Sequence, residues 1–291
     1  MNKLFCFGAG FTGSHTCEYF HKQGWITEGT TRDLNKIAKS KINLIHYNPD
    51  SEIINLGKSI LNSNILLVSI APGDQGDKVL ASNYKEVSLA LKKSVKRVIY
   101  LSTTAVYGDA NGAVVDEGYA LNPQSDRARK RIFAERQWTD LCKKYGVRIN
   151  ILRLSGIYGV GRNQIRNLIN GKAKRIIKKG HIFNRVHVRD IARIIYNLSI
   201  SDIESDIFNV SDDMPAPPQD VVEFASNLLN IKPPEAVPFD DANLSEMARS
   251  FYSETKFIEN AKIKEKLMLQ LEYPNYRVGL RHILKHEVGV D

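Results

Sequence analysis

The sequence predicts an α/β protein in which a doubly wound parallel sheet forms the main domain and the C-terminal part forms a smaller lobe. Three observations support this. An apolar run, Leu4–Phe7, passes directly into Gly8-Ala9-Gly10-Phe11-Thr12-Gly13. Strand-like apolar runs then alternate with segments of helical spacing as far as Leu154, and beyond it the alternation fades. Such alternation is typical of a parallel sheet covered by helices on both faces.

The first element is a buried strand, because Leu4–Phe7 is apolar on both of its faces. The Gly-x-Gly-x-x-Gly pattern behind it is typical of a turn that binds a dinucleotide pyrophosphate, with the next helix presenting its first N–H groups to the phosphates. An ordinary strand-to-helix turn is the alternative, but the position near the N-terminus and behind a strand favours the dinucleotide site. The residues expected at the phosphates are Gly8, Gly10, Phe11, Thr12 and Gly13.

The following elements keep the alternation of helix and strand. In order, we expect a helix at 11–23, strands at 25–31 and 44–47, a helix from the turn 48–51 to about Leu61, a strand at 65–70, a helix at 77–93 and a strand at 98–101. Ala71 and Pro72 form a small-residue turn directly after the clearest buried strand. That turn lies at the carboxyl edge of the predicted sheet, so we expect both residues to contact a cofactor.

The end of the second strand indicates which dinucleotide is bound. In such folds an acid there binds the ribose 2′-hydroxyl, whereas an Arg accommodates a 2′-phosphate. Thr31 and Arg32 stand at this place and favour NADP over NAD. Asp33 is an acid that could bind the ribose of NAD, so NAD remains the alternative, although this residue is equally suited to capping the next helix.

Composition and length place the chain among globular proteins. It has 291 residues, of which 43% are hydrophobic and 25% charged. No apolar run approaches the roughly 18 residues of a membrane span, and the N-terminus does not resemble a signal peptide, so we expect a cytoplasmic protein without a membrane partner. The three cysteines, Cys6, Cys17 and Cys142, show no metal-binding spacing and are expected to be buried, reduced thiols. We expect no metal site.

The net charge of +9 is located in one stretch. Ten Lys and Arg residues lie at positions 161–193, against the single acid Asp190. Such a stretch could bind nucleic acid or a phosphorylated or carboxylated small molecule. A solvated basic helix is the equally weighted structural alternative.

Several motifs resemble one protein family. The predicted fifth strand runs into Ser102-Thr103-Thr104-Ala105-Val106-Tyr107-Gly108, which with the glycine turn resembles the extended short-chain dehydrogenase/reductase superfamily, also called the NAD-dependent epimerase/dehydratase family. Leu152–Arg162 resembles the family's Leu-Arg-x-x-x-x-Tyr-Gly-Pro-Gly segment, Val186–Ala192 its Ile-His-Val-x-Asp-x-Ala segment, and Phe208–Val210 the strand that follows. The motifs stand in the family's order over nearly the whole chain. The resemblance implies a Rossmann-type fold.

The resemblance also implies catalytic positions. Thr103 stands where the family has the catalytic Ser/Thr that hydrogen-bonds the substrate oxygen beside the cofactor. The family's Tyr-x-x-x-Lys pair lies in a frame like Pro-x-Ser-x-Tyr-Gly-x-x-Lys-x-x-x-Glu, which residues 123–135 keep. However, Arg127 occupies the Tyr position and Arg131 the Lys position.

This departure matters because an arginine keeps its proton at physiological pH and cannot replace the tyrosine as acid or base. Arg127 and Arg131 are spaced i, i+4 on one helix face, where they could hold cofactor ribose or phosphate or neutralise an anionic substrate. A surface pair between Arg131 and Glu135 is the structural alternative.

Another proton donor is therefore needed if the chain catalyses a reaction. Tyr107, Tyr158 and a water-relayed Thr103 are candidates, and each has a packing or hydrogen-bonding alternative. The resemblance implies a structural role for Tyr107. We expect His187 and Asp190 to tie the sheet to the second domain rather than to act in catalysis.

We expect a dinucleotide-binding domain at 1–160, with 181–212 returning to it, and a smaller substrate-binding lobe formed by 161–180 and 213–291. The resemblance implies a homodimer formed through the helices at about 77–93 and 124–145.

The favoured function is that of an NAD(P)-dependent oxidoreductase or epimerase that binds NADP and acts on a small anionic substrate such as a nucleotide sugar. The first alternative is a catalytically inactive NADP-binding sensor or regulatory protein on the same scaffold, which the missing Tyr and Lys favour. The second is a nucleic-acid binder that uses residues 161–193, which no interleaved aromatic residues support.

Overall fold

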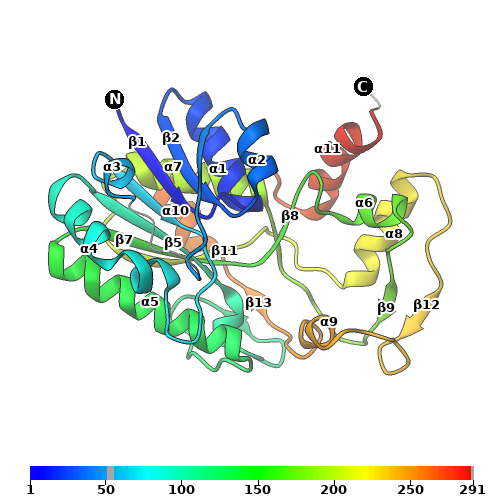
Figure 1. Cartoon of the computed structure of the whole chain (residues 1–291). Helices are drawn as coiled ribbons and strands as arrows, with labels where there is room; N and C mark the ends of the chain where they lie inside the picture. Colours follow the sequence, from blue (N-terminus) through cyan, green and yellow to red (C-terminus); the bar gives the residue numbers. More distant parts are fainter. Residues whose placement is uncertain (51–55, 290–291) are drawn as a thin grey trace. The chain divides into compact units, whose positions relative to one another are not determined.

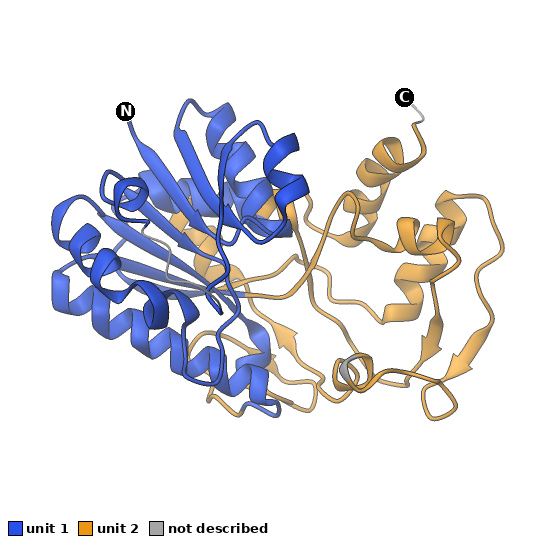
Figure 2. Cartoon of the chain, in the orientation of Figure 1, with its two compact units in different colours: residues 1–106, 123–153, 191–208 blue, residues 107–122, 154–190, 209–291 orange. Residues whose placement is uncertain are grey.

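A computed structural model describes residues 1–50 and 56–289 of the chain. They form two compact units, each assembled from three segments (Figure 2): residues 1–106, 123–153 and 191–208 in the first, and residues 107–122, 154–190 and 209–291 in the second. The domain limits expected from the sequence stay a prediction, because compactness alone does not test which segments bind cofactor or substrate.

The first unit is built around a seven-stranded parallel sheet (Figure 1), which confirms the predicted fold class. Its strands are β1 (Lys3–Phe7), β2 (Ile26–Thr31), β3 (Asn43–His46), β4 (Ile65–Val68), β5 (Arg97–Thr103), β7 (Arg148–Leu154) and β11 (Asp206–Val210). Their order is β11-β7-β5-β4-β1-β2-β3, so the direction of winding reverses between the adjacent strands β1 and β4. Ligands bind at such a switch point, beyond the carboxyl ends of the strands.

Helices cover the sheet and enclose its core. They are α1 (Phe11–Lys22), α2 (Leu34–Lys39), α3 (Gly57–Ile60), α4 (Lys78–Lys93), α5 (Asp126–Tyr145) and α7 (Val188–Ile200). Helices α4 and α5 pack side by side, and α1 packs on β1 and β2 (Figure 1). Leu4, Phe5 and Leu66 are fully buried, as the uninterrupted apolar runs predict for strands covered on both faces.

The second unit contains three pairs of short parallel strands among its described residues. They are β6 (Val114–Val115) with β13 (Phe257–Ile258), β8 (Gly156–Tyr158) with β10 (Arg185–His187), and β9 (Arg175–Ile177) with β12 (Ala236–Pro238). Its helices are α6 (Gln164–Ile169), α8 (Pro218–Leu228), α9 (Glu246–Ser250), α10 (Ala261–Leu267) and α11 (Tyr276–Val288). Helices α6, α8 and α11 pack together around buried residues that include Ile165, Val221 and Ile283.

Most predicted elements are confirmed with small shifts of their ends. The helix predicted from the turn 48–51 to about Leu61 lies partly outside the described residues, and α3 is found within its described part. Helix α11 lies in the tail that the sequence patterns place in the smaller lobe without assigning it a helix or a strand. That helix starts because the Asn275 side chain accepts a hydrogen bond from Val278 N at 3.0 Å, a capping signal that the Pro-containing tail obscured.

Candidate functional site

The glycine-rich turn joins β1 to α1 and contains one glycine that faces open space. Gly8 has φ +93°, and a methyl group there would lie 2.8 Å from Ile70 Cγ1. A methyl group on Gly13 would lie 2.3 Å from the carbonyl oxygen of Gly8. A methyl group on Gly10, in contrast, would meet no atom of the described residues within 4 Å. Packing therefore requires Gly8 and Gly13, whereas Gly10 leaves room for a ligand to approach the backbone.

Helix α1 begins in a way that favours an anion. Gly10 is its N-cap, no side chain caps it, and its first turn contains no acid. The exposed N–H groups at the start of a helix and its dipole then attract negative charge. Thr30 fixes the approach to this turn, because its side chain accepts from Gly8 N at 2.9 Å and its carbonyl accepts from Ala9 N at 2.6 Å. The turn, with Phe11 and Thr12 opening the helix, thus fits the phosphates of a dinucleotide.

The end of β2 is followed by a cation, Arg32, and by an acid, Asp33, and the two differ in whether they already have a partner among the described residues. The Asp33 carboxylate caps α2 by accepting from Asn35 N at 2.9 Å and Lys36 N at 3.3 Å, as one of the two sequence interpretations predicts. Thr31 is buried, and its hydroxyl accepts from Asp33 N. Arg32 is exposed and has no hydrogen-bond or ion-pair partner in the described part of the chain. Arg32 is therefore available to bind a ligand, whereas Asp33 already caps α2.

The turn after β4 lies beside the glycine turn. Ser69 N donates to Phe7 O at 2.8 Å, and Ile70 is the side chain that a methyl group on Gly8 would meet. Ala71 is exposed and Pro72 is half-buried directly after this contact. The structure therefore brings the 69–72 turn, including both predicted contact residues, to the same edge of the sheet as the glycines.

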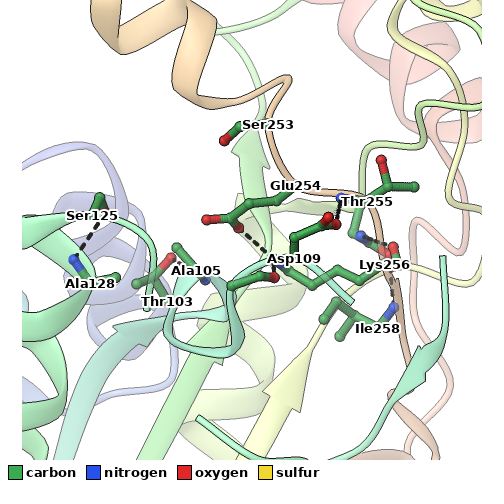
Figure 3. Close-up of polar contacts among 12 residues, drawn as sticks. Thr103, Ala105, Asp109, Ser125, Ala128, Ser253, Glu254, Thr255, Lys256 and Ile258 are labelled. Atoms are coloured by element: carbon green, nitrogen blue, oxygen red, sulfur yellow. Dashed lines mark hydrogen bonds and ion pairs between the residues drawn. The ribbon is translucent and has the colours of Figure 1, made fainter. Parts of the chain in front are cut away.

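Thr103 is the last residue of β5 and is half-buried. Its hydroxyl oxygen accepts from Ala105 N at 3.2 Å (Figure 3), at the start of the short 3-10 helix η1 (Thr104–Tyr107). The hydroxyl hydrogen is then still available to a substrate oxygen. This geometry is compatible with the role that the family resemblance implies, which stays a prediction.

A buried ionic network lies directly before Thr103 in β5. Ser102 Oγ donates to the Glu135 carboxylate, and Arg153 NH2 binds the same carboxylate at 2.9 Å. The Arg153 and Glu135 side chains are 4% and 5% exposed. The surface pair between Arg131 and Glu135 that the sequence analysis considered is therefore wrong, because Glu135 faces the sheet and is already paired.

The two arginines at the predicted Tyr and Lys positions have different surroundings. Arg131 NH1 donates to Leu101 O at 2.6 Å and to Tyr100 OH at 3.1 Å. Burial raises the pKa of Tyr100, so its phenol stays protonated and the oxygen accepts from the guanidinium. Arg127 is exposed and makes no hydrogen bond or ion pair with any described residue. Only Arg127 is wholly free to meet an anion, and the equivalence of both positions to the family's Tyr and Lys stays a prediction.

This difference leads to a prediction for stability. Arg131→Ala is expected to lower the free energy of unfolding by about 1–2 kcal/mol, because it removes charge-assisted hydrogen bonds. Arg127→Ala, the matched control on the same helix, should leave the urea midpoint unchanged. The double variant Arg127→Tyr with Arg131→Lys should still fold, since lysine can reach the same carbonyl. Loss of soluble protein in that double variant would mean that both arginines are structural.

The candidate tyrosines of the second unit have hydroxyl partners within that unit. Tyr107 is fully buried, and its hydroxyl donates to Asn209 Oδ1 at 2.7 Å. Tyr158 OH donates to Asn275 O at 3.4 Å, and burial raises the pKa of this phenol. These contacts favour a packing role for both side chains, and their service as acid or base stays a prediction.

His187 and Asp190 hold the start of α7 against a distant segment of the second unit. The Asp190 carboxylate accepts from Glu272 N at 2.8 Å and Tyr273 N at 2.9 Å. The His187 ring lies on the Tyr273 ring, with centroids 3.8 Å apart. Both residues therefore have structural partners.

The basic stretch 161–193 is spread over α6, β9, β10 and the start of α7, so the alternative of a solvated basic helix is wrong. Acids from the C-terminal part of the second unit neutralise some of it. Arg166 pairs with Glu287, Arg175 with Glu223 and Arg189 with Glu272, at 2.8, 3.5 and 3.4 Å. The sequence could not show this, because the acids lie 48 to 121 positions away.

A buried lysine of the second unit fixes the backbone that follows Tyr107. The Lys256 ammonium, in a side chain only 6% exposed, donates to Gly108 O at 2.5 Å and pairs with Glu254 at 2.5 Å (Figure 3). Next to it, Asp109 Oδ1 accepts from Thr255 N at 2.7 Å. No sequence motif links these residues, because they lie almost 150 positions apart.

Comparison with known proteins agrees with this α/β architecture and glycine turn. The model of the NAD dependent epimerase/dehydratase family matches residues 8–211, and the chain belongs to this family. Protein YeeZ of Escherichia coli K12 is 27% identical over 94% of this chain and 97% of its own. The structure of a functionally unknown conserved protein from Silicibacter pomeroyi is 40% identical, covers 98% of this chain and 99% of its own, and superposes with a TM-score of 0.89. MoeE5, solved in complex with UDP-glucose and NAD, is 20% identical over 98% of both chains with a TM-score of 0.77.

Proposed function

We propose that the chain binds NADP(H) and is an oxidoreductase or epimerase that acts on a small anionic substrate such as a nucleotide sugar. The observation that carries the proposal is the glycine turn, where Gly10 borders open space at the uncapped start of α1. MoeE5, which has the same fold, binds UDP-glucose and NAD, and this supports a dinucleotide and a nucleotide sugar as ligands here.

NADP is favoured over NAD by the charges at the end of β2. Arg32 is exposed and unpaired within the described residues, so it can bind a 2′-phosphate. An NAD site would use an acid to hold the ribose hydroxyls, but the Asp33 carboxylate already caps α2. NAD stays possible, because one carboxylate oxygen of Asp33 is not used in the cap.

A bound nicotinamide ring would supply hydride acceptance and return. Within the first unit, Thr103 would hydrogen-bond the substrate oxygen and relay the hydroxyl proton released during hydride transfer to water, and Arg127 would provide positive charge for an anionic group. The family's tyrosine chemistry is not proposed, because an arginine does not release its proton.

The proposed activity predicts turnover that depends on Thr103. Purified protein with NADP⁺ and UDP-glucose or UDP-glucuronic acid should form a changed sugar, followed by NMR, and Thr103→Ala should lower kcat/KM by about 100-fold through loss of a hydrogen-bond donor. The control Ser199→Ala removes a hydroxyl that donates to Ile195 O within α7 and should leave kcat/KM unchanged. Turnover in Thr103→Ala equal to that of the unmodified protein would contradict the assigned role.

A binding protein without catalysis is the second candidate, and the arginines at positions 127 and 131 favour it. It would bind NADP as a signal or support and report to a protein partner. NADPH binding without turnover of either sugar nucleotide would favour this candidate over the enzyme.

Partners and location are also proposals. We propose a homodimer through α4 and α5, which pack side by side and line a hollow of about 310 Å³ with Leu80, Tyr84 and Gln137. Within residues 1–50 and 56–289, no helix is long and apolar enough to cross a bilayer. The cytoplasmic location stays a prediction.

A further inference from the structure

Lys36 of α2 reaches the glycine turn, although no motif places it there. Its ammonium nitrogen donates to Ala9 O at 2.6 Å and to Gly10 O at 3.2 Å. These oxygens belong to the residue before the open glycine and to that glycine itself. The side chain therefore places a positive charge beside the proposed dinucleotide site.

This charge has no acidic partner among the described residues. Lys36 forms no ion pair with them, and the nearest acid in sequence, Asp33, caps α2 with its Oδ1. An ammonium has three N–H donors, and the two carbonyl oxygens use two of them. One donor is thus left for a ligand, and Arg32 at the end of β2 is a second available cation.

We propose that Lys36 and Arg32 together bind the 2′-phosphate of NADP, so that Lys36 is a specificity-determining residue of this site. The inference rests on the proposed function. Lys36 lies in the helix that follows β2, and the end of that strand meets the adenine ribose. The pyrophosphate is instead assigned to the start of α1, where backbone N–H groups bind it. A phosphate monoester carries up to two negative charges, which two cations match.

The competing role for Lys36 is a purely structural one, in which its ammonium only holds the glycine turn in place. In that case the ammonium would stabilise the two carbonyl oxygens and would serve every dinucleotide alike. The two roles differ in one measurable quantity, the ratio of the dissociation constants for NADH and NADPH.

The test is calorimetric titration of the purified chain with NADPH, NADH and 2′,5′-ADP. Lys36→Met keeps the length of the side chain and removes its charge, and Lys36→Arg keeps the charge. Lys39→Met, on the exposed end of the same helix, is the matched control. Thermal melting of each free variant checks that it is folded.

We expect Lys36→Met to lower the affinity for NADPH and for 2′,5′-ADP by about 10- to 100-fold, because a charge-assisted hydrogen bond is lost. The affinity for NADH should fall by less than about threefold. Lys36→Arg should retain most of the NADPH affinity, and Lys39→Met should bind as the unmodified protein does. Equal weakening of NADPH and NADH, or no weakening of either, would overturn the assignment of Lys36 while the proposed function stands. An unmodified protein that binds neither nucleotide would overturn the proposed function and this inference with it.

Discussion

Gly13→Ala is expected to destabilise the native fold by about 3 kcal/mol or more, whereas Gly10→Ala should fold normally and lose dinucleotide affinity. The added methyl group at Gly13 would lie 2.3 Å from the Gly8 carbonyl oxygen and 2.9 Å from Cys6 Sγ, so backbone atoms must shift. At Gly10 the methyl group meets no atom of the described residues within 4 Å.

Urea unfolding of both variants and NADPH titration of Gly10→Ala test this pair. The affinity of Gly10→Ala should fall about tenfold or more, equivalent to about 1.4 kcal/mol, because the methyl group occupies the space through which the pyrophosphate approaches. A urea midpoint of Gly13→Ala equal to that of the unmodified protein would contradict the close packing of α1 on β1 described above. Unchanged NADPH affinity in Gly10→Ala would place the cofactor elsewhere.

Glu135→Gln is expected to lower the free energy of unfolding by about 3–5 kcal/mol. The substitution keeps the shape of the side chain but removes the negative charge that faces the buried Arg153 guanidinium. Urea unfolding followed by circular dichroism measures this loss directly.

Glu204→Gln is the matched control, because Glu204 is 77% exposed and pairs with Arg148 at the surface. Its urea midpoint should change far less, since exposed ion pairs contribute little. The double variant Glu135→Leu with Arg153→Met should lose less stability than the sum of the single changes, because no unpaired charge remains in it. Equal midpoints for Glu135→Gln and Glu204→Gln would contradict the buried network.

Local sequence patterns were sufficient to predict the sheet and the glycine turn. Leu4–Phe7 and Ile65–Val68 are apolar without interruption, and the structure buries both strands completely or nearly so. Asp33 could be read from sequence as a helix cap, and it accepts the expected N–H groups. These features depend on neighbouring residues, so their physical causes are visible within one short segment.

Contacts between distant segments could not be predicted in the same way. Lys36 reaches Ala9 across 27 positions, and Lys256 reaches Gly108 across 148. Neither lysine stands in a motif, and exposed lysines are common in any globular protein. Glu135 and Arg153 did stand in recognisable segments, so the motifs could have suggested their pairing.

The central claim, an NADP site at the glycine turn, is tested most directly by fluorescence titration of the purified protein with NADPH and, separately, with NADH. We predict saturable NADPH binding with little affinity for NADH, because Arg32 is unpaired among the described residues and Asp33 is engaged in the α2 cap. Binding of neither nucleotide would contradict the claim and would leave the turn as an ordinary connection between strand and helix.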